Sequence, residues 1–297
     1  MAANVGRLSA TTILLRRVRP SPASRYDYQL LMQKRGNISR AGTYTFPGGV
    51  FEEADRHVKV TAVRELFEET GVLLRHRATP VDPVALESWR LRVHDDPSKF
   101  DSMLQSLNID IKDGEKLQHF CTFITPEFEK RKYTTLFFLT EGSEVELRGM
   151  AADGTETASL EWLDPEEALT KNRTGEMKFL PPQFYVLSEL SHYFEINRVF
   201  SHLLECTQDY AHDDVKTLFS RRNAKERVDG RGFPAMQPHP VPGKDKKTIV
   251  LTLPYDAEHH QYPGRSSQVH RVVAHMPMGI GRDFLRKEGI GRIINKL

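Results

Sequence analysis

The sequence predicts a fold of the α/β (α+β) class, in which strands and helices alternate along the chain. Segments rich in β-branched and aromatic residues are separated by segments with helical periodicity. A glycine pair at 48–49 leads into a helix that has one acidic and one apolar face. With 297 residues, of which 39% are hydrophobic, the chain can bury a real core, as one large domain or two small ones.

The expected strands lie on both sides of the acidic helix. They are the segments with the residue types that favour strands: 9–15, 28–33, 117–124, 133–140 and 159–163. Residues 80–112 have a helical pattern instead. We expect this helical insert either to form a pocket over a cleft or only to pack against the rest of the domain.

Helices are expected after the last of these strands. Asp164 is suited to cap a helix that begins at Pro165. A long helix is predicted from Pro181 to about 197, and a second one over 199–206. Residues 8–207 are therefore expected to form one domain.

The character of the chain changes after residue 207. Residues 208–246 are charged and rich in Gly and Pro, and the strand-like segments 247–253 and 270–275 are expected to pair. Residues 208–297 are therefore interpreted as a C-terminal extension with a strand pair.

Composition excludes several classes of protein. A net charge of +2 gives no reason to expect binding to nucleic acid or to a membrane surface. No apolar run is long enough to span a bilayer. Cys121 and Cys206 lie far apart without metal-ligand spacing, which favours free thiols in a reducing compartment.

The acidic helix carries the chemistry. At about 100° per residue, Glu65, Glu68 and Glu69 fall within roughly a 100° arc, while the apolar side chains point the other way: Val60, Val63 and Phe67. Gly71 stands where a C-cap glycine belongs, so the helix is expected to end at Thr70.

Three clustered carboxylates repel one another, and a cation would offset that repulsion. Oxygen ligands favour Mg²⁺ or Mn²⁺, and Mg²⁺ commonly acts beside substrate phosphates. Gly48 and Gly49 let the backbone approach a ligand closely. Arg64 is suited to orient a glutamate through a bidentate contact.

This stretch resembles the Nudix box, G-x5-E-x7-R-E-U-x-E-E-x-G-U, where U is a bulky apolar residue. The second half of the pattern matches position by position: Arg64, Glu65, Leu66, Glu68, Glu69, Gly71 and Val72. The first half departs, because Asp55 follows Gly49 by six residues and eight residues separate it from Arg64. The first acidic position is Asp55, Glu52 or Glu53.

The resemblance implies a Nudix fold, a mixed sheet sandwiched between helices, with the box at about 48–72. It further implies hydrolysis of a diphosphate with Mg²⁺ or Mn²⁺. Glu65, Glu69 and the Gly49 carbonyl are the implied metal ligands. Glu65, Glu68 and Arg64 are the implied catalytic residues, with Glu68 either a shared ligand or the base. The family places its base variably, sometimes outside the box.

Basic residues precede the box and suit the anionic groups of a substrate. Arg35 and Arg40 are the candidates, together with the backbone of Gly48. Ordinary solvated loop charges are the alternative for the two arginines.

Several stretches resemble the peroxisomal acyl-coenzyme A diphosphatase subgroup of this family: residues 46–50, 64–69, 71–74, 89–90, 135–139 and 181–185. The subgroup implies cleavage of coenzyme A or acyl-coenzyme A into 3′,5′-ADP and (acyl-)4′-phosphopantetheine. Mammalian members carry a long insertion inside the box, which this chain lacks. NADH, ADP-ribose or nucleotide sugars are alternative substrates, and a non-catalytic binding module is the alternative of another class.

The chain ends in Asn295-Lys296-Leu297, a variant of the Ser-Lys-Leu peroxisomal address. We therefore expect recognition by a peroxisomal import receptor, with cytoplasm or mitochondrion as alternative locations. Residues 1–20 carry four arginines and no acid, as transit peptides do, but residues 9–15 within them are interpreted as the first strand.

Overall fold

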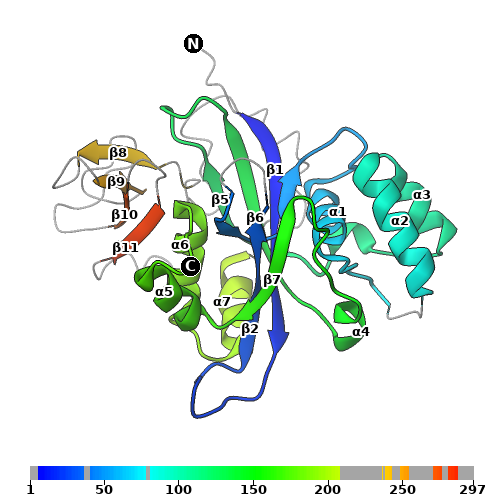
Figure 1. Cartoon of the computed structure of the whole chain (residues 1–297), viewed down its shortest axis with the longest axis horizontal. Helices are drawn as coiled ribbons and strands as arrows, with labels where there is room; N and C mark the ends of the chain where they lie inside the picture. Colours follow the sequence, from blue (N-terminus) through cyan, green and yellow to red (C-terminus); the bar gives the residue numbers. More distant parts are fainter. Residues whose placement is uncertain are drawn as a thin grey trace.

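The centre of the molecule is a mixed seven-stranded sheet (Figure 1). The computed structural model describes residues 6–36, 41–77, 81–207, 236, 238–242, 248–253, 270–275 and 280–286. The sheet order is β3–β2–β1–β6–β5, with β4 also paired to β1 and β7 to β2. β1 and β6 run parallel and the other pairs are antiparallel. The strands are β1 Arg7–Arg17, β2 Tyr28–Arg35, β3 Tyr44–Thr45, β4 Gly48–Val50, β5 Gln118–Ile124, β6 Tyr133–Glu141 and β7 Thr157–Leu163.

Both faces of this sheet are buried. Successive side chains of a strand point to opposite faces, so Leu30 packs into one core with Tyr185, and Leu31 packs into the other with Leu66. A strand buried on both faces needs apolar residues at every position. This explains why the middle of β1 shows no alternation in the sequence.

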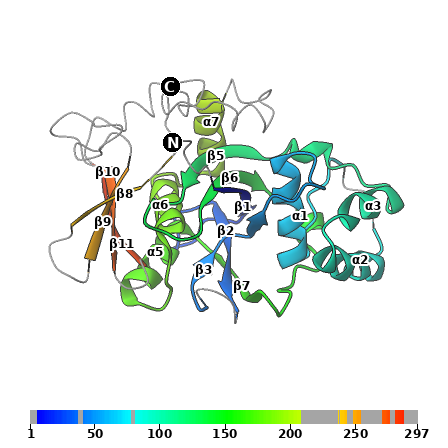
Figure 2. The same cartoon turned by 90° about the horizontal axis from the view of Figure 1, so that it is seen from above.

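Helices cover each face, which confirms the predicted sandwich (Figure 2). One face is covered by α1 Val58–Thr70, and α2 Pro83–Asp95 packs on the outer side of α1 with α3 Lys99–Ser106 next to it. The other face is covered by α5 Pro165–Thr174, α6 Pro181–Leu190 and α7 Ile196–Thr207. Two short helical segments, η1 Lys112–Gly114 and α4 Glu144–Leu147, complete this part. No helix in the described ranges is long and apolar enough to cross a membrane. Cys121 is a free thiol buried in the core.

The helix predicted from 181 to about 197 is wrong in its length. The structure ends α6 at Leu190 and starts α7 at Ile196. The hydroxyl of Tyr28 lies within hydrogen-bond distance of two carbonyls at this break, that of Tyr193 at 2.9 Å and that of Leu190 at 3.1 Å, and it can donate to either. Asp27 then accepts the Ile196 N–H at 2.7 Å and caps the new helix. Both side chains come from the start of the β2 region, far away in the sequence.

A second, antiparallel sheet of four strands lies against α6, in the order β11–β10–β9–β8. The expected pairing of 247–253 with 270–275 is confirmed, and β8 and β11 were not foreseen. Leu253 and Val272 belong to the same core as α6. The described part of the extension therefore packs onto the core; the boundary at 207/208 remains a prediction. The strands are β8 His239–Pro242, β9 Thr248–Thr252, β10 His270–His275 and β11 Ile280–Arg286.

Candidate active site

Strand β4 and helix α1 bring backbone and carboxylates together. Gly49 lies opposite Ala10 in the antiparallel pair of β4 with β1. A Cβ atom at Gly49 would lie 2.3 Å from the carboxyl carbon of Glu65, so only glycine allows this approach. Helix α1 ends at Thr70, and Gly71 caps it with φ 74°, as the sequence predicted.

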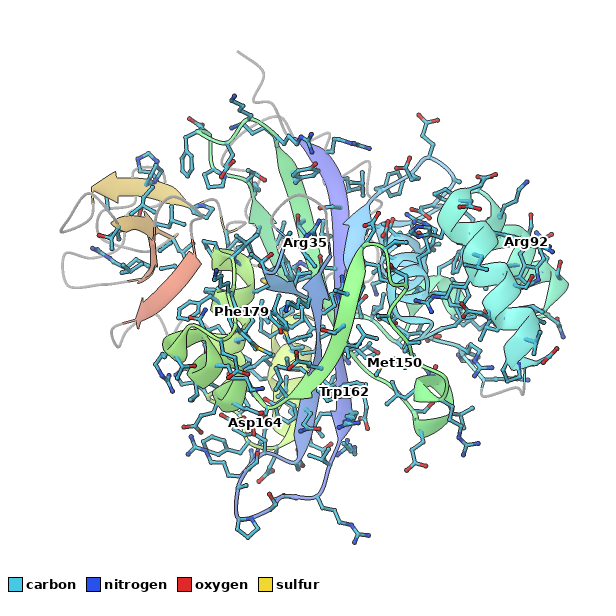
Figure 3. The ribbon with its side chains drawn as sticks, in the orientation of Figure 1. Arg35, Arg92, Met150, Trp162, Asp164 and Phe179 are labelled. Carbon is cyan, nitrogen blue, oxygen red and sulfur yellow. The ribbon has the colours of Figure 1, made fainter. Side chains whose placement is uncertain are left out.

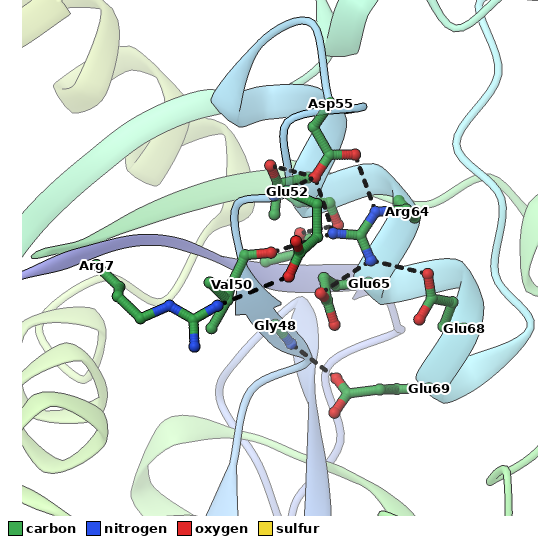
Figure 4. Close-up of polar contacts among 12 residues, drawn as sticks. Arg7, Gly48, Val50, Glu52, Asp55, Arg64, Glu65, Glu68 and Glu69 are labelled. Atoms are coloured by element: carbon green, nitrogen blue, oxygen red, sulfur yellow. Dashed lines mark hydrogen bonds and ion pairs between the residues drawn. The ribbon is translucent and has the colours of Figure 1, made fainter. Parts of the chain in front are cut away.

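The guanidinium of Arg64 is the hub of the site (Figure 4). Its side chain is 1% exposed and uses all five N–H donors. Two go to the carboxylate of Asp55, at 2.9 and 2.8 Å, and one to the Val50 carbonyl at 3.2 Å. The remaining two go to Oε1 of Glu65 at 2.9 Å and Oε1 of Glu68 at 2.8 Å. The expected bidentate contact therefore exists, but its partner is Asp55 and not a glutamate.

Among the three candidates for the first acidic position, the structure places Asp55 beside Arg64. Asp55 is 3% exposed and also accepts the hydroxyl of Thr61 at 2.9 Å. Glu52 is 46% exposed and faces Arg7 at 3.8 Å, while Glu53 is exposed. Asp55 is therefore the acidic residue before α1 that pairs with Arg64.

Glu69 lies at the end of the same helix face. Its Oε2 accepts the backbone N–H of Gly48 at 2.7 Å (Figure 4). Burial raises the pKa of Glu69 well above its ordinary value, and the nearby charge of Glu65 raises it further. Burial also raises the pKa of Glu65 to about 8, against the lowering effect of Arg64. The pKa of Glu68 is raised for the same reason.

Arg64 supplies one positive charge to four carboxylates, so it does not neutralise the cluster; they belong to Asp55, Glu65, Glu68 and Glu69. A divalent cation would supply the missing positive charge, and the donor set is all oxygen, as Mg²⁺ or Mn²⁺ prefers. Within the part of the chain that the structure describes, no three acidic, His or Cys side chains form a ready-made metal cage. Mg²⁺ keeps several waters and commonly takes one or two carboxylates directly, so it does not require a ready-made cage of protein ligands. The residues present therefore fit such an ion.

The structure brings some of the predicted site residues together and leaves the role of others untested. Glu65, Glu68, Glu69, Arg64 and Gly49 lie together. The backbone N–H of Gly48 is taken by Glu69, so its predicted contact with substrate remains a prediction. Arg35 stands partly buried at the end of β2 (labelled in Figure 3), and its contact with substrate is likewise untested by the fold. Arg40 lies outside the described residues.

Sequence reasoning missed the role of Arg90 in the helical insert. Arg90 is buried, and it donates to the Glu68 carbonyl and to the Ala151 carbonyl, each at 2.9 Å. It thereby ties α2 to the end of α1. The only sequence signal is an arginine among apolar residues on the inner face of α2. This contact supports the packing role of the insert; a pocket role is not tested.

Gln33 was also missed. It is 2% exposed in β2, and a hydrogen bond from its side chain favours the charged form of Glu69. The available signal for a role of Gln33 was a polar residue that directly follows the apolar Leu31 and Met32 in a strand.

Comparison with known proteins finds similarity to Nudix hydrolases. A family model described as the NUDT19 Nudix domain matches residues 56–190. A putative nudix hydrolase 7 of Caenorhabditis elegans is 30% identical over 62% of this chain and 60% of that protein. Acyl-coenzyme A diphosphatase NUDT19 of Gallus gallus is 27% identical over 60% of this chain and 65% of its own length. The protein of the same name from Homo sapiens is 33% identical over 47% of this chain and 40% of its own length. This chain thus spans less than two thirds of these relatives.

A solved structure supports the fold. The NUDIX hydrolase from Alicyclobacillus acidocaldarius superposes with a TM-score of 0.55 at 23% identity, covering 67% of this chain and 97% of that one. The structure therefore has a Nudix fold, and its residues 56–190 match the Nudix domain of the NUDT19 proteins.

Proposed function

We propose that this chain hydrolyses the diphosphate of coenzyme A or acyl-coenzyme A, giving 3′,5′-ADP and (acyl-)4′-phosphopantetheine. The observation that carries the proposal is the buried Arg64, which holds Glu65 and Glu68 in place beside Glu69. The names of the vertebrate relatives, acyl-coenzyme A diphosphatases, support the choice of substrate.

The chemistry fits the charges of the site. A diphosphate concentrates negative charge, so attack by water needs neutralisation and positioning. Mg²⁺ or Mn²⁺, when bound, polarises phosphoryl oxygens and activates a water. Glu65, Glu69 and the Gly49 carbonyl would hold the ion.

Arg64 fixes the side chains of Glu65 and Glu68 before substrate arrives, because its two Nη1 donors bind one oxygen of each. In the role of base, Glu68 would take the proton of the attacking water at Oε2, since Arg64 holds Oε1. As a shared ligand it would present the same oxygen to the ion.

Product analysis tests the proposal. Purified protein is incubated with Mg²⁺ and coenzyme A, an acyl-coenzyme A, NADH or ADP-ribose, and the products are separated chromatographically. We expect 3′,5′-ADP from the two coenzyme A substrates and none after addition of a chelator. Cleavage of NADH or ADP-ribose alone would retain Nudix chemistry and reject the coenzyme A substrate. A folded protein that turns over none of them would favour a binding module.

We also propose that the chain is imported into peroxisomes by a receptor that binds Asn295-Lys296-Leu297. These residues lie outside the described part of the structure. Such receptors read a free C-terminal tripeptide. One residue added after Leu297 of an N-terminally tagged protein is therefore expected to abolish import, and unchanged import would reject this address.

A further inference from the structure

The side-chain amide of Gln33 is buried near Glu69, at the C-terminal end of α1. Gln33 is 2% exposed in β2, between β3 and β7, where its neighbours are Thr45 and Leu160. Residues two apart in a strand share a face, so Gln33 projects on the side of Leu31, which packs into the core of α1. An amide on this face costs free energy unless its polar atoms find partners.

One end of the amide faces Glu69. A hydrogen bond from Gln33 favours the charged carboxylate. Because a carboxylate only accepts, this end is the Nε2 donor. Glu69 receives its other donor from the Gly48 backbone at 2.7 Å. The two donors come from β2 and β4, which both pair with β1, so the carboxylate is held between two fixed strands.

The other end of the amide has no partner among the described residues. Oε1 of Gln33 is buried, and no described residue donates a hydrogen bond to it. A buried acceptor without a donor is costly, whereas an apolar side chain of similar size would avoid the cost. The missing donor is therefore one that the described residues do not supply. A water bound to a divalent ion is a strong donor, and groups beside metal ligands commonly accept from such waters or orient the ligands.

We propose that Gln33 is a positioning residue of the metal site: its Nε2 orients Glu69, and its Oε1 accepts a hydrogen bond from a water on the ion that Glu69 holds. The inference rests on the proposed metal-dependent function. Gln33 touches neither the ion nor the substrate, so its effect is exerted on ligand geometry and on one bound water.

The test is Mn²⁺ binding by the full chain, measured without substrate. Mn²⁺ is titrated into wild-type protein and Gln33→Leu, and the free ion is measured by electron paramagnetic resonance. Loss of a group that orients a ligand typically weakens metal binding 10- to 100-fold, so we expect Mn²⁺ affinity to fall about tenfold or more. In EDTA, Gln33→Leu should keep the far-UV circular dichroism of the wild type, so that a lower Mn²⁺ affinity cannot be attributed to unfolding.

Gln118→Leu is the matched control. Gln118 is also a strand glutamine whose buried Oε1 has no partner among the described residues. It lies in β5, which β1 and β6 separate from β2. We expect its Mn²⁺ affinity to equal that of the wild type.

The outcomes separate this inference from the proposed function. Absence of Mn²⁺ binding by the wild type would overturn both. Binding by the wild type with equal affinity in Gln33→Leu would overturn the inference alone. If Gln33→Leu does not fold, Gln33→Asn, which withdraws the amide by one methylene, is judged by the same affinity criterion.

Discussion

Replacing Asp55 with asparagine should cost about 3 kcal/mol of unfolding free energy. The carboxylate accepts two N–H groups of Arg64 at 2.9 and 2.8 Å, the hydroxyl of Thr61 at 2.9 Å and the Glu52 N–H at 3.2 Å. Asparagine turns one acceptor into a donor that faces other donors, and it removes the charge opposite a buried guanidinium. Breaking a buried pair costs about 3–5 kcal/mol, and the lower end applies because Glu65 and Glu68 still offset Arg64.

The assay is urea unfolding in EDTA, compared at equal m-value. Glu52→Gln is the matched control, because Glu52 is the other candidate for this acidic position. Its ion pair with Arg7 spans 3.8 Å between half-exposed side chains and should contribute less than about 0.5 kcal/mol. A loss below about 1 kcal/mol for Asp55→Asn, or an equal loss for Glu52→Gln, would refute the assignment of Asp55 as the partner of Arg64.

Three further predictions follow from the same site. Glu69→Gln should abolish diphosphate hydrolysis at unchanged far-UV circular dichroism, while the exposed Glu53→Gln stays active; turnover by Glu69→Gln would reject Glu69 as a ligand. Metal-free protein should lose stability as pH rises from 4.5 to about 8, because folded Glu65 keeps a proton that the unfolded chain has released. In EDTA, the melting temperature should therefore fall less across this pH range in Glu65→Gln than in the wild type. An equal fall in both proteins would contradict the raised pKa of Glu65. Arg90→Met should cost about 2 kcal/mol in urea unfolding because two carbonyls lose a charged donor, whereas the exposed Arg92→Met on the same helix (Figure 3) should cost little.

The sequence predicted the elements that depend on local signals. Five strands of the main sheet, β1, β2, β5, β6 and β7, follow from β-forming residues, whereas the short β3 and β4 were not predicted. The start of α5 at Pro165 follows from capping, and the end of α1 follows from Gly71. The break between α6 and α7 was missed because its causes, Tyr28 and Asp27, act from another part of the chain. β8 was missed because its segment, His-Pro-Val-Pro, contains two prolines, which usually mark a loop.

The candidate site shows the same limit. The spacing of Glu65, Glu68 and Glu69 is a local property, and the structure keeps them on one helix face. The choice of Asp55 over Glu52 depends on how the loop turns back to Arg64, which spacing alone left open. Gln33 reaches the site from β2 and Arg90 from the helical insert, so the pattern of the box does not predict either of them.

Anomalous scattering from crystals grown with Mn²⁺ would test the central claim most directly. The account predicts a peak next to the carboxylates of Glu65 and Glu69 and the carbonyl of Gly49, and no such peak in crystals of Glu69→Gln. Wild-type crystals with no Mn²⁺ at these residues, or with the ion elsewhere in the domain, would contradict the assignment of this cluster as the metal site.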